Sequence, residues 1–324
     1  STNLEIGIKT QLRGKIEKEG SFTVQAKLLA DYINLLPKEK ISLELKDQTV
    51  YIECQKHETY IKGLESSDFP VIPEVNKDKK VKLKSIDLKK ALNQVMFSVT
   101  LDESRPEISG IFFSISNNKL LLVGTDSYRL AEKSIALTDS SGEEHKIIVP
   151  LRTLQELNRI LSETNQEEII IYINDSQIMF VLEDEVELVS RLIEGQYPDY
   201  KQIIPTESKT QTKVKVEELS RIIKSVSLFC KPGVNDVKLN LLEEKNELIV
   251  SAANSGIGEN TVTLSTEISG IDNEVVFNYR YFLDGLSNLG EDEVVLELVN
   301  DNSPGVMKAD KNGNYLYIVM PIKQ

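Results

Sequence analysis

The feature that most constrains this chain is a segment pattern that occurs three times. Its copies read SFTVQAKLLADYINLLPKEKISLELKDQTVYI, KIIVPLRTLQELNRILSETNQEEIIIYINDSQIMF and EVVFNYRYFLDGLSNLGEDEVVLELVNDNSPGV. Each copy begins with a short apolar strand near Val24, Val149 or Phe277, continues with a helix, and ends in strands joined by an Asn- or Asp-containing turn. Such a repeat predicts three similar units rather than one large fold.

A second module also recurs. It reads VKLKSIDLKKALNQVMFSV from Val81 and TKVKVEELSRIIKSVSLF from Thr212. Each copy predicts a strand and a helix, followed by paired strands with turns at 117–118 and 245–246. A complete unit is therefore helix, strands, helix, strands, which indicates an α+β fold.

The first unit lacks its leading half. LEIGIK at Leu4 fits the slot of LLLVGT at Leu121, so a leading helix and hairpin, roughly 40 residues by the length of the second unit, are expected to be absent. A truncated chain, omitted disordered residues or a divergent protein would each explain this. We expect domains at 1–79, 80–206 and 207–324, with PEVNKDKK and PTESKTQT as polar linkers. An aromatic-Pro pair precedes each linker, in SSDFPVIP and EGQYPDYKQIIP.

The bulk composition agrees with several compact domains. The chain has 324 residues, 40% of them apolar, 27% charged, and a net charge of −13. These values are typical of a soluble, self-repelling protein and predict no long-range attraction to nucleic acid. No apolar run is long enough for a membrane helix and no signal-peptide stretch is present, so we expect a cytoplasmic protein without membrane contact. Cys54 and Cys230 are too far apart to suggest a disulfide framework or zinc site.

Catalysis has little support in the sequence. His57 and His145 lie in polar surroundings without a matched nucleophile, which favours surface positions, and no nucleotide-binding or hydrolase motif occurs. The EDE runs at Glu183 and Glu291 are typical of solvated strand ends, with a magnesium-binding acidic loop as the alternative. We therefore expect no enzyme activity, no metal and no cofactor.

The order of elements and four strings resemble the bacterial DNA polymerase III beta subunit, the DNA sliding clamp family. The strings are RPEISGIFFSI, VGTDSYRLAEKS, EGQYPDYKQIIP and YLYIVMPIKQ. The resemblance covers essentially the whole chain. It implies a homodimeric ring of six similar domains, with antiparallel sheets outside and helices inside, that encircles duplex DNA without reading its sequence. It also implies partners, namely polymerase subunits, the clamp loader and repair proteins, that bind through short linear motifs.

The helices carry cations away from their apolar stripes. On the helix from Leu88 to Val99, the apolar side chains recur at helical spacing and leave two lysines and Gln94 outside the stripe. A solvated face would explain this equally. Because the family's helices line the central hole, the resemblance implies that these cations contact phosphates. The candidate DNA-facing residues are Lys89, Lys90, Arg152, Arg159, Arg221 and Lys224.

A peptide-binding groove between the second and third domains is the second implied site. The strings TDSYRL, YPDYKQI and YIVMPIK match its walls, although the apolar members could instead be ordinary core. Ser127-Tyr128 replaces the family's usual Gly-His, and Gln202 stands where a basic residue is frequent. The implied wall is Ile108, Thr125, Ser127, Tyr128, Arg129, Leu130, Pro198, Gln202, Ile203, Ile318, Val319, Met320, Pro321 and Ile322.

The third implied site is the subunit interface. Leu228 and Phe229 match the apolar pair that packs across the family's dimer contact, and Tyr60 and Ile61 match the partner face, although all four could be core residues. A different class of function remains open, in which the chain is a repeat scaffold that binds proteins only and never encloses DNA.

Overall fold

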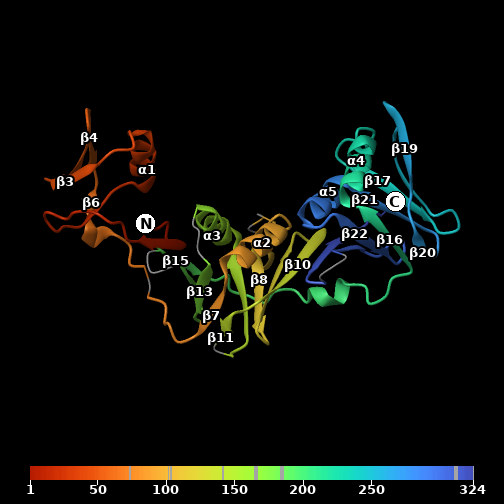
Figure 1. Cartoon of the computed structure of the whole chain (residues 1–324), viewed down its shortest axis with the longest axis horizontal. Coiled ribbons are helices and arrows are strands. Elements are labelled where there is room, and N and C mark those ends of the chain that lie inside the picture. Colours follow the sequence, from red (N-terminus) through yellow and green to blue (C-terminus); the bar gives the residue numbers. More distant parts are fainter. Residues whose placement is uncertain are drawn as a thin grey trace.

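The computed structural model describes residues 1–72, 74–100, 102, 104–140, 142–163, 167–182, 186–309 and 313–323. Figure 1 shows them as an arc, with the three copies following one another and the helices α1, α3, α2, α5 and α4 along its concave side. The strands lie on the outer side of the second and third copies. The predicted α+β fold with three related copies is thereby confirmed.

The first copy has one helix and six strands among its described residues. They are Ile6–Thr10 (β1), Phe22–Thr23 (β2), Ala26–Leu35 (α1), Ser42–Lys46 (β3), Thr49–Cys54 (β4), His57–Lys62 (β5) and Leu64–Glu65 (β6), followed by the 3₁₀ turn Ser66–Asp68 (η1). Its core is small. Leu36, Ile52, Cys54 and Ile61 are buried together, and no residue of α1 is fully buried.

The second copy contains a complete repeat. Its elements are Lys80–Lys84 (β7), Ser85–Met96 (α2), Pro106–Ile108 (η2), Gly110–Ser116 (β8), Lys119–Thr125 (β9), Arg129–Ala136 (β10), Asp139–Ser140 (β11), His145–Pro150 (β12), Leu151–Glu163 (α3), Glu168–Ile173 (β13), Gln177–Leu182 (β14), Val186–Arg191 (β15) and Tyr200–Ile203 (η4). Leu88, Leu92 and Val95 recur at helical spacing, and α2 buries all three against the sheets.

The third copy repeats the same order. Its elements are Thr210–Lys215 (β16), Val216–Ser227 (α4), Asp236–Leu242 (β17), Glu247–Asn254 (β18), Gly258–Ser265 (β19), Ile268–Gly270 (β20), Asn273–Asn278 (β21), Tyr279–Asn288 (α5), Glu293–Leu298 (β22), Gly305–Ala309 (β23) and Tyr315–Val319 (β24). One continuous apolar core runs through the second and third copies.

Neighbouring copies are joined by strand pairing. β10 of the second copy pairs antiparallel with β24 of the third, and β1 of the first copy pairs antiparallel with β15 of the second. The copies therefore share sheets across their junctions, and backbone hydrogen bonds fix their relative placement. Toward the two ends of the arc, β5 pairs only with β4 and β19 only with β18 among the described residues, so each strand leaves one edge unpaired.

The aromatic-Pro segments occupy equivalent places in the fold. The residues just before each segment pair with the strand that leads into the second helix of the copy. The equivalent pairs are Thr23 with Leu64, Ile148 with Ile193, and Phe277 with Pro321 at the corresponding point of the third copy. The repeat inferred from these strings is therefore also a repeat in space.

The predicted hairpin at 117–118 is confirmed. Asn117 and Asn118 have positive φ of 50° and 57° between β8 and β9, as a two-residue type I′ turn requires. Asn tolerates this conformation because its short side chain can bond locally. The hairpin between β3 and β4 uses Asp47 and Gln48 in the same way.

Three expectations from the sequence were wrong in detail. The segment at Leu4 forms β1, which is equivalent to β10 and not to β9, the strand that contains Leu121. Strand β1 pairs with β15 of the next copy as β10 pairs with β24 of the next copy. The helix expected to reach Val99 ends at Met96. The last three residues of the expected linker PTESKTQT belong to strand β16, which begins at Thr210. The buried hydroxyl of Thr210 donates to the carbonyl of Ile271.

Candidate partner surface and DNA-facing helices

The loop from Thr125 to Arg129 is closed by its own side chains. Asp126 Oδ1 accepts from the backbone N–H groups of Tyr128 and Arg129 at 2.9 and 3.0 Å. Thr125 Oγ1 accepts from the Ser127 N–H at 3.1 Å and donates to the Arg129 carbonyl at 2.6 Å. Ser127 is held at φ 77°, the left-handed region that favours glycine.

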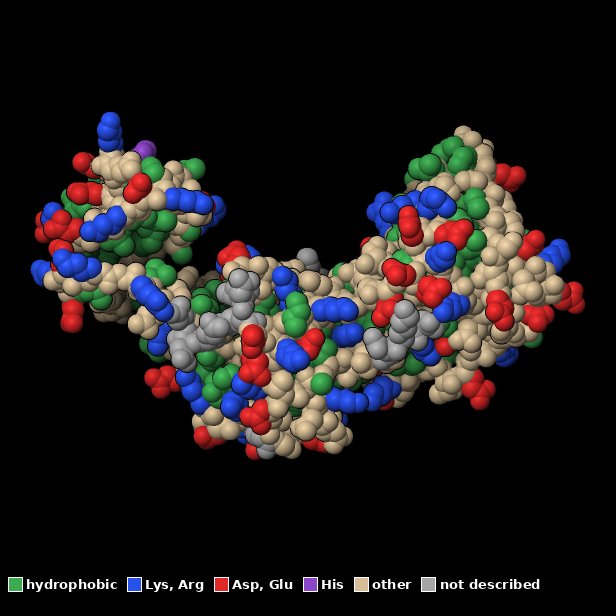
Figure 2. Space-filling model, viewed as in Figure 1, with side chains coloured by type: hydrophobic (Ala, Val, Ile, Leu, Met, Phe, Trp, Pro, Cys, Tyr) green, Lys and Arg blue, Asp and Glu red, His purple; other side chains and the backbone are tan. Residues whose placement is uncertain are grey.

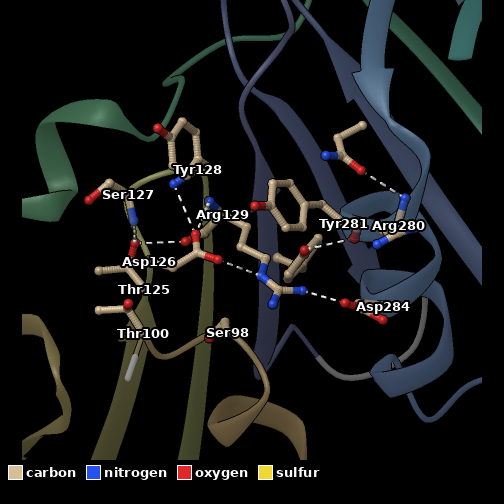
Figure 3. Close-up of polar contacts among 12 residues, drawn as sticks. Ser98, Thr100, Thr125, Asp126, Ser127, Tyr128, Arg129, Arg280, Tyr281 and Asp284 are labelled. Atoms are coloured by element: carbon tan, nitrogen blue, oxygen red, sulfur yellow. Dashed lines mark hydrogen bonds and ion pairs between the residues drawn. The ribbon is translucent and has the colours of Figure 1, made fainter. Parts of the chain in front are cut away.

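Arg129 connects this loop to the third copy (Figure 3). Its Nε donates to Asp126 at 2.9 Å and its Nη1 donates to Asp284 on α5. The guanidinium lies over the rings of Tyr281 and Phe97, with 4.6 and 5.5 Å to their centroids. Burial opposes the charge, yet Tyr317, Asp284 and Asp126 together raise the pKa of Arg129 above its ordinary value.

Part of the implied groove wall forms a compact apolar cluster. Ile108, Leu130 and Ile318 are buried together with Tyr197 and Tyr200, which belong to the segment leading out of the second copy. Figure 1 shows that segment, with η4, on the outer side of the arc. The structure thus brings three strings far apart in the sequence to one place.

Two tyrosines fasten the segment to the sheet. The Tyr197 hydroxyl donates to the Val123 carbonyl at 3.3 Å, and its ring stacks on Phe112 at 4.9 Å. The Tyr200 hydroxyl donates to Glu132 of β10. Burial raises the pKa of Tyr197 and, together with the Glu132 contact, that of Tyr200, so both stay neutral donors.

The polar and exposed wall residues surround this cluster. Tyr128 is 63% exposed, Ile203 is 43% exposed, and Pro198 and Gln202 are exposed as well. Gln202 Nε2 donates to Asp199 at 2.9 Å. These residues form the accessible part of what we call the partner surface, meaning the predicted wall residues together with the cluster beneath them.

The terminal strand supplies the remaining wall residues. The Met320 N–H donates to the Tyr128 carbonyl and the Ile322 N–H to the Val276 carbonyl, both at 2.8 Å. Met320, Pro321 and Ile322 are half-buried, whereas Val319 belongs to the main core. The side chain of Val319 therefore lies beneath the partner surface and is not accessible to a ligand.

The predicted DNA-facing cations lie on helices of the concave side. Lys90, Arg152, Arg221 and Lys224 are exposed and Lys89 is half-buried. Figure 2 shows Lys and Arg side chains along the inner edge of the arc. Arg159 differs, because Glu156 and Glu163 on the same helix accept from its guanidinium and raise its pKa. Its charge is thus largely compensated within α3.

Gln94 was expected outside the apolar stripe of α2, and this was wrong. Its side chain is buried, and Nε2 donates to the carbonyls of Asn288 and Leu289 at 3.0 and 2.9 Å. These carbonyls lie at the C-terminal end of α5, where helix carbonyls lack partners within the helix. Gln94 therefore links a helix of the second copy to one of the third.

The predicted interface residues lie toward the two ends of the chain's fold. Leu228 follows α4 and is 73% exposed, while Phe229 is half-buried and packs near Gly258, the first residue of β19. Tyr60 on β5 is exposed, and Ile61 is buried in the core of the first copy. Of these four predicted interface residues, only Leu228 and Tyr60 are largely exposed.

The groups considered for chemistry remain apart. No three His, Cys, Asp or Glu side chains among the described residues are grouped to hold a metal ion. His57 is exposed, but the expected surface position of His145 was wrong, because its ring is mostly buried. Cys54 and Cys230 are buried free thiols.

The EDE run at 183–185 lies outside the described residues. No helix in the described part of the chain could span a membrane.

Sequence reasoning missed Tyr281, Asp284 and Glu132. Each contacts a residue of the partner surface from another copy or strand, and no local motif marks it. Asp284 lies on α5, four positions after Arg280. From the sequence alone, it could have been read only as an exposed charge on a helix.

Comparisons with known proteins cover nearly the whole chain. Family models of the DNA polymerase III beta subunit match residues 1–73 (N-terminal domain), 82–199 (central domain) and 201–323 (C-terminal domain). The beta sliding clamp of Staphylococcus epidermidis is 29% identical over 327 residues, covering 99% of this chain and 86% of that protein; that of Staphylococcus aureus gives the same values.

Solved structures give the same result. The crystal structure of the DNA polymerase III beta subunit of Thermotoga maritima has a TM-score of 0.94 at 26% identity and covers 100% of this chain and 87% of that one. The DNA polymerase sliding clamp of Bacillus subtilis has a TM-score of 0.92 at 26% identity with the same coverage.

Proposed function

Because the chain belongs to the DNA polymerase III beta subunit family, we propose that it is a DNA sliding clamp, a ring that encircles duplex DNA and tethers the replicative polymerase. This is a non-enzymatic role. Two chains form the ring, and other DNA-processing proteins use the same tether through short linear motifs.

The observation that carries the proposal is the rule by which copies join. At the junction of the second and third copies, β10, the third strand after α2, pairs with β24, the third strand after α5. At the junction of the first and second copies, β1 stands in the place of β10 and pairs with β15, the third strand after α3. Applied once more, the rule requires a partner β5 for β19, and the chain's own β5 lies in the first copy, at the opposite end of the arc. A second chain supplies it, and two such contacts close a ring.

The concave side of that ring is where DNA would lie. Lys90, Arg221 and Lys224 are the strongest candidates for phosphate contacts, with Lys89 and Arg152 beside them, while Arg159 contributes less because its charge is compensated. A net charge of −13 is compatible with this role, since a closed ring is retained by topology and needs only weak contacts. Weak contacts also permit sliding.

The partner surface is the proposed binding site for short peptides. Buried Ile108, Leu130 and Ile318 provide an apolar base, and Tyr128 and Ile203 provide exposed apolar contacts. A few apolar anchors on such a surface supply the roughly −8 kcal/mol of a micromolar complex. Tyr128 in place of the family's usual histidine keeps an aromatic wall.

The remaining assignments follow the same proposal. Domain boundaries at 1–79, 80–206 and 207–324 place one repeat in each domain, and β7 and β16 begin close to them. The ring would work in the cytoplasm, where bacterial DNA is replicated. The rival function, a scaffold that binds proteins only, requires no closed dimer.

Dimer closure gives the test. Leu228→Asp places a charge on the proposed interface, and we expect the chain to change from dimer to monomer in light scattering after gel filtration. Val71→Asp, at a position that is 90% exposed in the segment between η1 and β7, is the control and should remain dimeric. A parent chain that is monomeric at all concentrations would contradict ring formation.

A further inference from the structure

We propose that Arg129 is a positioning residue that couples the partner surface to the junction between the second and third copies. A peptide bound on the surface would stabilise the junction, and an intact junction would strengthen peptide binding. The inference rests on the proposed peptide-binding function and adds to it a residue pair, Arg129 and Asp284, that acts through position.

Arg129 forms ion pairs with Asp126 and with Asp284, and we call this pair of contacts the bridge. Its side chain is only 12% exposed and donates in two directions, to Asp126 in its own loop and to Asp284 on α5 of the third copy. The planar guanidinium holds its Nε and Nη1 donors in a fixed fork that reaches both carboxylates, whereas a lysine ammonium is a compact point charge without this fork. The ring of Tyr281, also on α5, lies against the same group.

The loop itself does not need this bridge. Thr2 to Ile6 forms the same closed loop in the first copy: Leu4 has φ 78°, and Asn3 Oδ1 accepts from the N–H groups of Glu5 and Ile6. Thr2 also repeats both contacts of Thr125. Ile6 is at the position of this loop that corresponds to Arg129, so the loop closes without an arginine. The ion pairs of Arg129 therefore serve the contact with α5.

The bridge also reaches the exposed part of the partner surface (Figure 3). Tyr128, next to Arg129, stacks on Tyr281 with 6.3 Å between ring centroids and 20° between planes. Its carbonyl accepts from Met320. Ser127 Oγ accepts from Arg105 at 2.7 Å. Any ligand that orders Tyr128 therefore acts on a residue that stacks on Tyr281 of α5.

Thermodynamic linkage makes the coupling reciprocal. If the bridge favours the peptide-binding arrangement of Tyr128, peptide binding favours the bridge by the same factor. Neither effect requires a change of fold, only a more ordered loop and helix.

The test uses the full chain and a fluorescein-labelled hexapeptide with leucine and phenylalanine side chains, followed by anisotropy. Asp284→Asn should weaken binding by about fivefold or more. Glu274→Gln is the matched control: Glu274 is 51% exposed and pairs with Lys238, which is not a residue of the partner surface, and Asp284 is 49% exposed. Equal dissociation constants for parent, Asp284→Asn and control would overturn the inference.

Hydrogen exchange of α5 separates coupling from general destabilisation. In the parent chain, the peptide should slow exchange of amides in 281–288, although the peptide contacts the outer surface. In Asp284→Asn and in Arg129→Lys this protection should be lost while the folded content stays unchanged. Failure of the parent chain to bind the peptide would overturn the peptide-binding function itself; binding without α5 protection would overturn only the coupling.

Discussion

Gly285 on α5 is a residue whose identity is fixed by close packing. A Cβ at this position would lie 2.4 Å from the ring of Tyr317 and 3.1 Å from Met307 Sδ. Helix interiors ordinarily disfavour glycine, so its presence here reflects the close approach of α5 to β24 rather than local propensity.

Gly285→Ala should therefore destabilise the chain by about 1–3 kcal/mol, because the ring of buried Tyr317 must move to admit the methyl group. Urea unfolding measures the change. Gly14→Ala is the control, since nothing lies within 4 Å of the added atom, and it should change stability by less than about 0.5 kcal/mol. An unchanged midpoint for Gly285→Ala would show that α5 does not pack as described.

His145 provides a pH-dependent contribution. Burial, assisted by Lys79 and opposed by Glu143, lowers the pKa of His145 below its ordinary 6.5. The unfolded chain then binds the proton more readily, so this group's contribution to stability is lost as pH falls from 6.5 through the lower folded pKa.

The measurement compares the parent with His145→Gln by urea unfolding between about pH 7.5 and about pH 5.5. The stability of the parent relative to the variant should decrease as pH falls. A difference that stays constant across this interval, or that grows in the parent's favour, would contradict the assigned burial of the imidazole.

At the scale of elements, the repeat made the helices and their apolar faces predictable. Leu219, Ile223 and Val226 are buried on α4 as the spacing indicated, and the Asn-Asn hairpin formed where turn chemistry placed it. Both features depend on residues within one element. The sequence therefore contains all the information needed to predict them.

Contacts between copies could not be predicted in the same way. Gln94 has a polar side chain that alone suggests exposure, but the free carbonyls of α5 give it buried partners. Likewise, LEIGIK fits a strand in either slot, and only the pairing of β1 with β15 identifies the right one. The family resemblance predicted the wall residues of the partner surface, whereas the contacts of Arg129 with α5 became visible only in the structure.

Gln94→Leu tests the helix contact between copies. Removing the amide leaves the carbonyls of Asn288 and Leu289 without this donor, and we expect a loss of about 1–3 kcal/mol in the free energy of unfolding. Gln155→Leu, an exposed position on α3, is the control and should lie within about 0.5 kcal/mol of the parent. A stabilised Gln94→Leu variant would mean that the contact is not formed.

In the molecule as a whole, retention on DNA and affinity for DNA depend on different features. Few cations on the concave side can contact phosphates at once, and Arg159 is compensated by its own helix. Binding to short linear duplexes should therefore be weak, with a shallow dependence of log K on log salt, because the slope scales with the number of phosphates neutralised. A steep slope with tight binding to open duplexes would indicate a charge-driven DNA-binding protein instead.

Retention on a circular plasmid measures the enclosure of DNA directly. The chain is loaded onto nicked circular DNA, the complex is isolated by gel filtration in moderate salt, and one half is linearised with a restriction enzyme. We predict that the chain stays with the circular DNA and is released from the linear DNA. Equal retention on the circular and the linear DNA would contradict an encircling ring.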